Sequence, residues 1–597
     1  MRSPAEILKS VFGYKSFRPF QEDIISNILN RKDLLAVMPT GGGKSLCYQV
    51  PALIFDGLTV VISPLISLMM DQVSQLRQLG VSAVMLNSAI PSGEYCYNYD
   101  LVMKGKARLL YLAPESLQKE DVIKLLLSVR VDCITVDEAH CISEWGHDFR
   151  KEYRQIALLR KRLPSAVFIA FTATATRRVQ DDIIKSLEMQ HPEKFVASFD
   201  RTNLFLKVVQ KNNPYEQAVA FINEHRGKSG IIYCFSRKQV DDLYKKLSAA
   251  GYSARPYHAG LSDVERHQNQ DQFIKDDIDI IIATIAFGMG INKPDVRFVL
   301  HYDLPKNIES YYQEIGRAGR DGLKADCLLL FGYGDLVKLN HFIDQKETER
   351  DYLNAKSHLN AMVSYAECNV CRRIPMIEYF GEKFNKENCG MCDNCVSGQE
   401  GLVDITVYAQ KFLSAVKRTG EMFGAQYIID VITGKENERI LGNRHQSLSV
   451  FGCGMELDKS DWQFLVPQFV ANKLLIRDPV FGGLKIADKG KMILLGSIKL
   501  SGRIKERKAS KAPRKKTEFS EKNNQDLFNI LRSKRKELAA QMNVPPYVIF
   551  SDKTLQEMCN YMPCDKISFL EINGVGKQKL ESYGNIFISL IKDYSRK

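Results

Sequence analysis

A glycine-rich turn near the N-terminus has the residue types that bind phosphate. The segment MPTGGGKS, residues 38–45, follows an apolar run and precedes a stretch with helical spacing. Backbone N–H groups at the start of a helix bind anions, and the helix dipole strengthens the attraction. Lys44 is placed to reach the β- and γ-phosphates of a nucleotide and Ser45 to ligate Mg²⁺, although Met38 stands where the general pattern has Gly. The residues expected to hold the nucleotide here are Thr40, Gly41, Gly42, Gly43, Lys44 and Ser45.

Two adjacent carboxylates follow another apolar run, in VDEAH at residues 136–140. We expect Asp137 to hold Mg²⁺ and Glu138 to position and deprotonate an attacking water. Acidic pairs at strand ends are common, so this segment is informative mainly through its pairing with the glycine-rich turn. Together the two segments predict a site that hydrolyses ATP with Mg²⁺.

A third segment, QEIGRAGR at residues 313–320, contributes Gln313 and two arginines as catalytic candidates. Arg317 and Arg320 are three residues apart, so we expect both on one face of a helix. Arginine is permanently charged and bidentate, which suits the charge that develops on a transferring phosphoryl group. The alternative is ordinary surface ion pairing. If the arginines complete the site from a second domain, hydrolysis must accompany closure of the cleft between the domains.

Short apolar runs alternate with helix-like stretches through the first half of the chain, which is typical of parallel α/β folds. We expect a first group of buried strands at residues 33–38, 59–63, 107–113, 132–138 and 167–173. A second group is expected at residues 229–235, 278–284, 296–302 and 325–331. The pattern predicts two α/β domains that join near residues 200–206.

After about residue 335 the alternation stops, and smaller helical units are expected. Two strand-like runs around a Pro/Gly turn, within residues 472–490, predict a wing-like hairpin. Residues 501–519 hold eight Lys or Arg and two Glu and lack apolar periodicity, which favours a flexible basic linker. The expected units cover residues 1–203, 204–335, 336–400, 401–500, 501–519 and 520–597.

Five of the 14 cysteines lie within residues 368–395. The others are scattered singly among apolar residues, which fits a reducing cytoplasm better than a disulfide scaffold. A structural Zn²⁺ site takes four ligands, so one of the five is spare. Composition does not choose it, because we expect Cys368 and Cys371 to share a helix face. A closed site of four thiolates would support folding rather than chemistry.

The net charge of the 597 residues is +13, which permits a polyanionic partner without proving one, and residues 501–519 supply nearly half of it. No apolar run approaches the roughly 18 residues that a membrane span needs. The N-terminal segment lacks a secretory apolar region. We therefore expect a cytoplasmic protein of several domains with no membrane partner.

Taken together, the motifs resemble those of superfamily 2 helicases, and more narrowly those of RecQ DNA helicases. DEAH alone also marks a group of RNA helicases. What separates the families is FGYKSFRPFQ (12–21) together with CISEWGHDFR (141–150). The resemblance covers nearly the whole chain and includes SPLISLMMDQV (63–73), YLAPESL (111–117), FTATAT (171–176), IIYCFSR (231–237), YHAGL (257–261), ATIAFGMGINKPDVRFV (283–299) and SYYQEIGRAGRDG (310–322).

The resemblance implies two RecA-like parallel-sheet domains, then a helical zinc-binding module, a winged-helix domain and a small all-helical HRDC domain. It also implies that Tyr14, Arg18 and Gln21 select adenine by stacking and bidentate hydrogen bonding, which a Gln amide suits. The alternative for these three residues is the packing face of an N-terminal helix.

In RecQ proteins the segment that matches residues 141–154 senses single-stranded DNA. Trp145 and Phe149 are therefore expected to stack on bases, worth about 1–3 kcal/mol per base, and Arg150 to meet phosphate or nucleotide. The alternative is that both aromatics belong to a domain core. Further contacts to the DNA backbone are expected from Ser63, Thr284 and Asn292.

For the later modules, the resemblance implies specific ligands and contacts. The first zinc ligand of the family precedes Arg-Arg, as Cys371 does, which leaves Cys368 as a buried thiol. In some relatives an aromatic on the wing splits the first base pair, and Phe481 is the candidate, with an exposed turn residue as the alternative. The HRDC segment 574–579 is suited to bind phosphate, and the domain should tune substrate choice and be dispensable for hydrolysis. The implied zinc ligands are Cys371, Cys389, Cys392 and Cys395.

These expectations describe an ATP- and Mg²⁺-dependent DNA helicase with a structural Zn²⁺ and 3′→5′ polarity, acting in DNA repair and recombination. Implied partners are single-stranded and partly duplex DNA, a single-stranded-DNA-binding protein or a topoisomerase, in a bacterial cytoplasm near the nucleoid. A duplex translocase or RNA helicase would share the motor motifs without needing the two family segments. A non-hydrolysing scaffold would lack a catalytic group, whereas Lys44, Glu138, Arg317 and Arg320 are all present.

Overall fold

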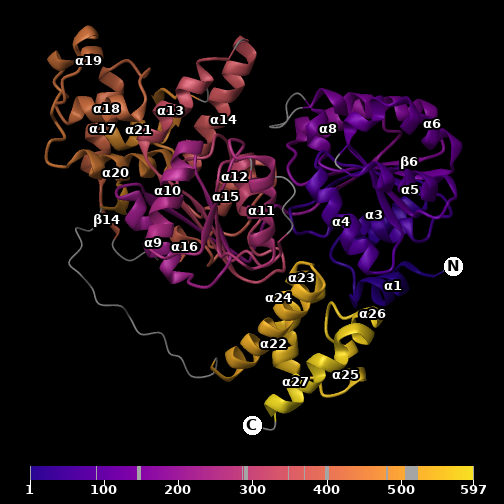
Figure 1. Ribbon diagram of the computed structural model, residues 1–597. Coiled ribbons are helices and arrows are strands. Elements are labelled where there is room, and N and C mark those ends of the chain that lie inside the picture. Colours follow the sequence, from indigo (N-terminus) through magenta and orange to yellow (C-terminus); the bar gives the residue numbers. More distant parts are fainter. Residues whose placement is uncertain are drawn as a thin grey trace.

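Two large α/β domains lie side by side, and smaller units are attached to them (Figure 1). In the view of Figure 1 the C-terminal domain lies below the gap between the two. This architecture confirms the expected fold class. The computed structural model describes residues 2–88, 90–143, 150–285, 287, 293–346, 348–368, 370–396, 402–478, 482–504 and 522–595.

The first domain contains a seven-stranded parallel sheet in the order β3-β4-β2-β5-β6-β1-β7. All residues of β1, β2, β5 and β6 are buried, which explains why these strands appear in the sequence as nearly continuous apolar runs. The strands are β1 Leu34–Val37, β2 Leu58–Ile62, β3 Ala83–Leu86, β4 Leu109–Leu112, β5 Val131–Val136, β6 Val167–Thr172 and β7 Glu193–Val196. The helices are α1 Pro4–Ile7, α2 Gln21–Leu29, α3 Lys44–Ala52, α4 Ile66–Gln78, α5 Ser92–Met103, α6 Glu120–Ser128, α7 Ile156–Arg162 and α8 Arg177–Ser186.

The second domain repeats this plan with six parallel strands in the order β10-β11-β9-β12-β13-β8. Its strands are β8 Leu204–Gln210, β9 Gly230–Tyr233, β10 Ala254–Tyr257, β11 Ile280–Ala283, β12 Phe298–His301 and β13 Ala325–Phe331. Its helices are α9 Pro214–Glu224, α10 Arg237–Ala249, α11 Asp263–Ile274 and α12 Ile308–Ile315. Residues 197–203 connect the last strand of the first domain to β8, and we call them the hinge.

Beyond the second sheet, a helical module surrounds the cysteine cluster and a helix-rich domain follows. The hairpin of β15 Leu475–Arg477 and β16 Leu484–Ile486 confirms the predicted wing-like pair of strands. The side chain of Trp462 is fully buried in the core of this domain. The helices of these units are α13 Tyr333–Ile343, α14 Glu349–Glu367, α15 Arg373–Tyr379, α16 Asp393–Val396, α17 Thr406–Arg418, α18 Ala425–Ile432, α19 Glu438–Gly442, α20 Lys459–Ala471 and α21 Asp488–Leu494.

The predicted start of the basic linker at residue 501 is wrong. Ser501–Arg503 form strand β17, which pairs antiparallel with β14, Leu402–Asp404. The two strands join the first and last residues of the helix-rich domain, so Arg503 belongs to that domain. Composition suggested a linker because lysines and arginines dominate the residues that follow, and a pairing partner a hundred residues away leaves no local signal.

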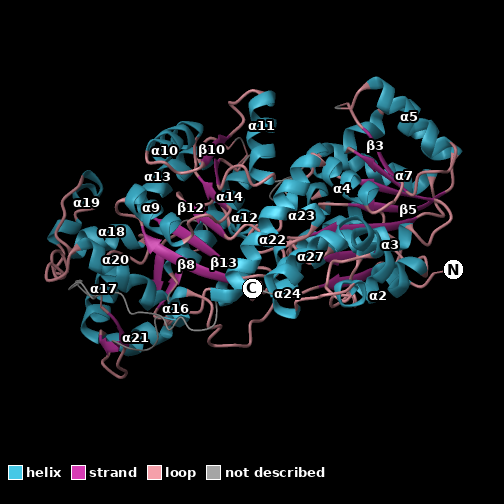
Figure 2. Cartoon of the chain, turned by 60° about the horizontal axis from the view of Figure 1, so that its bottom comes forward, coloured by secondary structure: helices cyan, strands magenta, loops and turns pink. Residues whose placement is uncertain are grey.

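The C-terminal domain is all-helical and contacts both large domains. The N–H of Gly574 donates to the carbonyl of Gly13 in the first domain at 3.0 Å. Lys536 pairs with Asp277 of the second domain at 3.1 Å. Figure 2, in which the bottom of Figure 1 comes forward, shows α22 and α23 in front of the junction of the two large domains. Its helices are α22 Lys522–Gln541, α23 Pro546–Ile549, α24 Asp552–Tyr561, α25 Lys566–Leu570, α26 Lys577–Lys579 and α27 Asn585–Ser595.

All nine strands predicted for the two large domains are present, and four more were missed. The missed strands are short, partly exposed or contain polar residues and proline: β3, β7, β8 and β10. Among the described helices, none combines the length and apolar character needed to cross a membrane.

Candidate active site and metal centre

The glycine-rich turn lies at the start of α3, and two side chains from an earlier segment donate hydrogen bonds to its carbonyls. Gly41 and Gly43 have φ of 81° and 82°, in the left-handed region where glycine is favoured, and α3 begins at Lys44. Arg18 donates from Nη1 to the carbonyl of Gly41, and Gln21 donates from Nε2 to the carbonyl of Gly43 at 3.0 Å. These bonds fix the carbonyls away from the helix start, where N–H groups bind anions.

Asp137 and Glu138 follow β5 directly and face the same region as Lys44. Burial and the neighbouring charge of Glu138 raise the pKa of Asp137 to about 6, while Lys44 acts in the opposite direction. A carboxylate in such surroundings gains from a nearby cation, so the site fits a Mg²⁺ ligand. Glu138 has φ 47°, in the left-handed region, and its N–H donates to Oδ1 of Asp137 at 3.0 Å.

Arg317 and Arg320 lie beyond the end of α12 and not on a helix face, so the predicted helical spacing is wrong. The helix ends at Ile315, and Gly319 has φ 56°, so the chain turns where a helix was expected. We call residues 316–320 the arginine turn. Burial, followed by the guanidiniums of Arg317 and Arg201, lowers the pKa of Arg320 to about 9, and Glu138 opposes this. The turn thus gathers positive charge beside the carboxylates.

One cavity of about 920 Å³ encloses the glycine-rich turn, both carboxylates and the arginine turn. Tyr14, Arg18 and Gln21 line it as well. Tyr14 is 42% exposed, whereas Gln21 is 1% exposed and accepts from the Arg18 N–H at 2.8 Å. The Gln21 amide keeps one N–H and one lone pair for another partner. Three domains form this cavity, and all the predicted nucleotide residues except Gly42 line it.

A hydrogen bond joins the two large domains beside this cavity. Gln313 of α12 donates from Nε2 to the hydroxyl of Thr174 in the first domain at 3.1 Å. The turn containing Gly316 also approaches the glycine-rich turn, since a Cβ on Gly316 would lie 3.3 Å from Cβ of Thr40. The two domains are therefore in contact at the site, as the motif argument expected.

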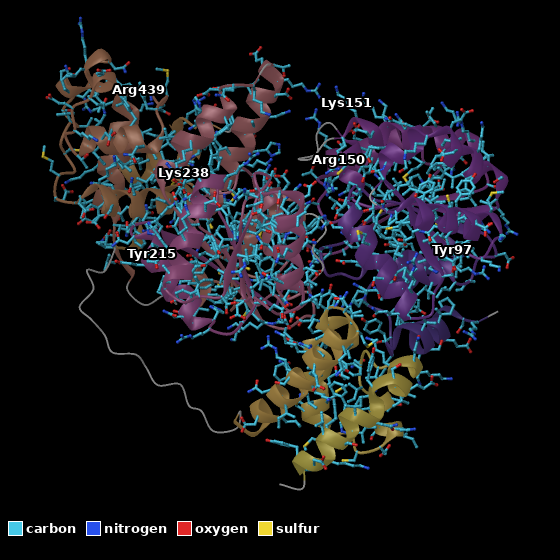
Figure 3. The ribbon with its side chains drawn as sticks, in the orientation of Figure 1. Tyr97, Arg150, Lys151, Tyr215, Lys238 and Arg439 are labelled. Carbon is cyan, nitrogen blue, oxygen red and sulfur yellow. The ribbon has the colours of Figure 1, made fainter. Side chains whose placement is uncertain are left out.

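The predicted DNA contacts are spread more widely. Arg150 lies at the edge of the first domain that faces the second (Figure 3), and its Nη1 donates to the carbonyl of Pro64 at 3.2 Å. Ser63 is 2% exposed at the end of β2, so its hydroxyl is buried here. Thr284 follows β11 and is half-buried. Four predicted residues lie outside the described part of the chain: Trp145, Phe149, Asn292 and Phe481.

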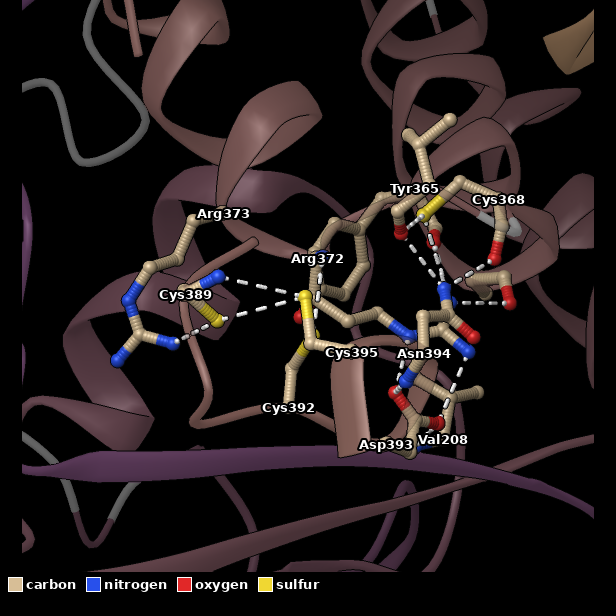
Figure 4. A network of polar contacts seen from close by, with 12 residues as sticks. Val208, Tyr365, Cys368, Arg372, Arg373, Cys389, Cys392, Asp393, Asn394 and Cys395 are labelled. Atoms are coloured by element: carbon tan, nitrogen blue, oxygen red, sulfur yellow. Dashed lines mark hydrogen bonds and ion pairs between the residues drawn. The ribbon is translucent and has the colours of Figure 1, made fainter. Parts of the chain in front are cut away.

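Four cysteines come together beside β8 (Figure 4). Their sulfur atoms all lie within 4.8 Å of one another, and they are Cys371, Cys389, Cys392 and Cys395. N–H groups are directed at the sulfurs: Arg373 Nη1 reaches Cys389 Sγ at 3.1 Å, and the Arg372 N–H reaches Cys392 Sγ at 3.5 Å. Such donors stabilise thiolates, so the cluster fits a tetrahedral Zn²⁺.

Cys368 does not join the cluster. It caps the end of α14 in an extended conformation, and Cys371 lies beyond that end, so the two do not share a helix face as predicted. Its thiol donates to the carbonyl of Val370 at 3.8 Å and accepts from Arg372 Nη1 at 3.5 Å. The end of the helix, which the sequence pattern did not reveal, separates the spare thiol from the other four.

Five family models match successive parts of the chain. They are DEAD/DEAH box helicase at residues 18–183, helicase conserved C-terminal domain at 212–322, RecQ zinc-binding at 333–396, RQC domain at 399–511 and HRDC domain at 524–591. The ATP-dependent DNA helicase RecQ of Haemophilus influenzae is 43% identical over 98% of this chain and 95% of its own. This chain belongs to the RecQ family of ATP-dependent DNA helicases.

Other proteins are similar to this chain as well. RecQ of Bacillus subtilis is 39% identical over 99% of this chain and 98% of its own. A putative ATP-dependent RNA helicase of Acanthamoeba polyphaga mimivirus is 40% identical over 74% of this chain and 84% of its own. Among solved structures, S. cerevisiae Dbp5 bound to RNA and ADP BeF3 aligns with 60% of this chain and 98% of its own, at 17% identity and a TM-score of 0.47.

Two residues of the cavity region, Tyr547 and Arg201, were missed from the sequence of this RecQ-family chain, whereas Lys579 was indicated only as part of the segment 574–579. Tyr547 and Lys579 of the C-terminal domain line the cavity, and Arg201 of the hinge contacts both halves of the site. Burial lowers the pKa of Lys579 to about 8. In the segment 574–579, which was predicted to bind phosphate, the N–H of Gly574 donates to the carbonyl of Gly13. The docking of one domain on another leaves no pattern in local residue spacing. Of the missed residues, only Arg201 could have been suspected from the sequence, because it is a charged residue in the segment that connects the two large domains.

Proposed function

We propose that the chain couples ATP hydrolysis to 3′→5′ translocation on single-stranded DNA and to duplex unwinding, in DNA repair and recombination. The observation that carries the proposal is the single cavity that holds Lys44, Glu138 and the arginine turn together. A site divided between two domains can hydrolyse ATP only when the domains meet, so each turnover opens and closes the cleft. Such alternation is the mechanical step of a motor.

In the proposed cycle, Tyr14 stacks on adenine while Arg18 and Gln21 bond its edge. Lys44 and the N–H groups of the glycine-rich turn hold the phosphates, and Ser45 and Asp137 would hold Mg²⁺, which neutralises developing charge on the phosphates. Glu138 accepts a proton from the attacking water. Gln313, Arg317 and Arg320 complete the site from the second domain and stabilise charge on the transferring group.

DNA contacts are proposed along both domains, from Ser63, Trp145, Phe149, Arg150, Thr284 and Asn292. The winged-helix domain would hold the duplex, with Phe481 as a candidate wedge between base pairs. Zn²⁺ bound by Cys371, Cys389, Cys392 and Cys395 would support folding. A single-stranded-DNA-binding protein or a topoisomerase, within a bacterial cytoplasm near the nucleoid, completes the proposed setting.

A second candidate is unwinding of RNA, because one relative carries that name. Strand displacement distinguishes the two. The chain is given a 3′-tailed DNA duplex, a 5′-tailed DNA duplex and a 3′-tailed RNA duplex of equal length, with ATP and Mg²⁺. We expect unwinding of the first only, and none by Lys44→Ala. Unwinding restricted to the 5′-tailed or RNA duplex would contradict the proposal.

A further inference from the structure

The hinge carries a guanidinium that is bonded to both halves of the site. Arg201 donates from Nη1 to the carbonyl of Thr40 at 2.6 Å and to that of Gly316 at 3.3 Å. Its Nη2 donates to the carbonyls of Ala318 and Gly319 at 3.0 and 3.1 Å. Within the part of the chain that the structure describes, no carboxylate lies within ion-pair distance of this side chain. All of its partners are main-chain carbonyls.

These four carbonyls belong to two elements from different domains. Thr40 is the residue before Gly41 in the glycine-rich turn, and the other three belong to the arginine turn. The two turns are already in close approach, because a Cβ on Gly41 would lie 3.4 Å from Cα of Arg320. One planar guanidinium, whose donors have a fixed geometry, therefore sets the relative position of the phosphate loop and the arginines.

The charge of Arg201 should make this arrangement more favourable when an anion is bound. Burial lowers the pKa of Arg201, and Arg201 in turn is one of the groups that lower the pKa of Arg320 to about 9. Closing the arginine turn onto the glycine-rich turn thus brings like charges close together. A triphosphate between them would offset the repulsion, whereas the four carbonyls alone compensate one charge. Closure should accordingly be favoured by bound nucleotide.

A purely structural role for Arg201 is separable from this one, because another residue already holds the arginine turn within its own domain. Asn203 donates from Nδ2 to the carbonyls of Gly319 and Leu323 at 2.9 and 2.8 Å. What Arg201 adds is the bond to Thr40 across the cleft. The hinge backbone is also held by the zinc-binding module, since Arg373 donates from Nη2 to the carbonyl of Arg201 at 2.8 Å.

We propose that Arg201 is a positioning residue for ATP hydrolysis. It aligns the arginine turn with the glycine-rich turn when the domains close, and it acts through main-chain carbonyls without touching ATP. The proposal rests on the proposed function, in that Arg317 and Arg320 are taken to complete the ATP site.

The test compares Arg201→Gln and Arg201→Lys with Asn203→Ala as the matched control. We expect Arg201→Gln to lower kcat of DNA-stimulated ATP hydrolysis by about 100-fold, with KM for ATP changed by less than about threefold. Arg201→Lys, which keeps the charge but not the planar fork, should fall between Arg201→Gln and the unaltered chain. Asn203→Ala should lower the midpoint temperature of thermal unfolding, and its kcat should fall much less than that of Arg201→Gln.

Two further readouts separate alignment from structure. Affinity for ADP with aluminium fluoride, which mimics the transferring group, should fall in Arg201→Gln while affinity for ADP stays unchanged. The double variant Arg201→Gln/Arg320→Ala should be no slower than Arg320→Ala, because both changes act on one step. Equal losses of ADP and transition-state-mimic affinity, or fully multiplicative losses in the double variant, would overturn the proposal. If Lys44→Ala and Arg320→Ala both hydrolyse ATP normally, the proposed site itself is wrong.

Discussion

Arg373 of the zinc-binding module and Asp200 of the hinge form an ion pair of 2.6 Å in which the arginine side chain is 2% exposed. The same guanidinium donates to the carbonyl of Leu204 at 2.9 Å and to Cys389 Sγ at 3.1 Å. It therefore joins a member of the cysteine cluster to the segment between the two large domains. We infer that the zinc-binding module supports the geometry of the hinge.

Arg373→Ala should lower the free energy of unfolding by about 3 kcal/mol or more, because it removes a buried guanidinium and leaves the partly buried Asp200 carboxylate without its partner. Urea unfolding with the metal bound measures this. Lys124→Ala is the control, since the Lys124–Glu120 pair is exposed, with side chains 70% and 82% accessible. That variant should change stability by less than about 0.5 kcal/mol. Equal effects of the two changes would contradict the buried role of Arg373.

The cysteine assignment predicts a difference between two conservative substitutions. Cys392→Ser should lose bound zinc, because Cys392 is one of the four clustered thiols, whereas Cys368→Ser should keep it. Metal content of the purified protein measures the outcome directly, and circular dichroism shows whether the module stays folded. Loss of zinc from Cys368→Ser with retention in Cys392→Ser would mean that the ligand set is different.

The pKa of Asp137, raised to about 6, predicts a pH dependence of nucleotide binding. As the pH falls through about 6, Asp137 takes up a proton and loses the charge that attracts Mg²⁺. The advantage of Mg·ATP over metal-free ATP should shrink between about pH 7.5 and about pH 5.5. Titration with a fluorescent ATP analogue, with and without Mg²⁺, measures it.

Protonation of Asp137 would not cause this loss of Mg·ATP binding by unfolding the protein. A raised pKa in the folded state means that Asp137 adds stability at low pH, and this contribution is lost as the pH rises through about 6. A constant ratio of the two affinities across the pH range would contradict the Mg²⁺ role.

Docking of the C-terminal domain can be tested at Gly13. A Cβ on Gly13 would lie 2.7 Å from the main-chain nitrogen of Gly576, so Gly13→Ala should release the domain from the cavity. Gly80→Ala is a close control, because Gly80 has the same φ of 74° and its nearest neighbour would be a side-chain oxygen of Gln578 at 3.6 Å.

We expect KM for ATP to rise in Gly13→Ala by at least about threefold, with kcat nearly unchanged, since Tyr547 and Lys579 would leave the cavity wall. Limited proteolysis should detect the released domain. Unchanged KM together with demonstrated release would show that the domain does not contribute to nucleotide binding.

Much of the fold was predictable from the sequence because its strands are buried on both faces. Runs such as 167–173 carry a signal within a few residues, and so do the glycines and lysine at 41–44. Local spacing also indicated the cysteine cluster, because five cysteines lie within residues 368–395. It did not show which four of them bind the metal. Local chemistry of this kind needs no knowledge of distant partners.

The remaining features depend on contacts between residues far apart in the chain. The pairing of Leu402–Asp404 with Ser501–Arg503 places the end of the helix-rich domain later than predicted. The chain forms a turn at residues 316–320, where the sequence predicted a helix. Arg201 is 161 residues from Thr40, so no periodicity connects them. Tyr547 lines the nucleotide cavity only because its domain docks against both of the others.

The central claim is that one ATP site is completed by an arginine from the second domain. Arg320→Ala tests it most directly, through kcat of DNA-stimulated ATP hydrolysis with ATP affinity measured in parallel. The account predicts a fall in kcat of at least about 100-fold and an affinity within about fivefold of the unaltered chain, while Arg226→Ala on the exposed surface changes neither. Hydrolysis by Arg320→Ala at the rate of the unaltered chain would contradict the claim.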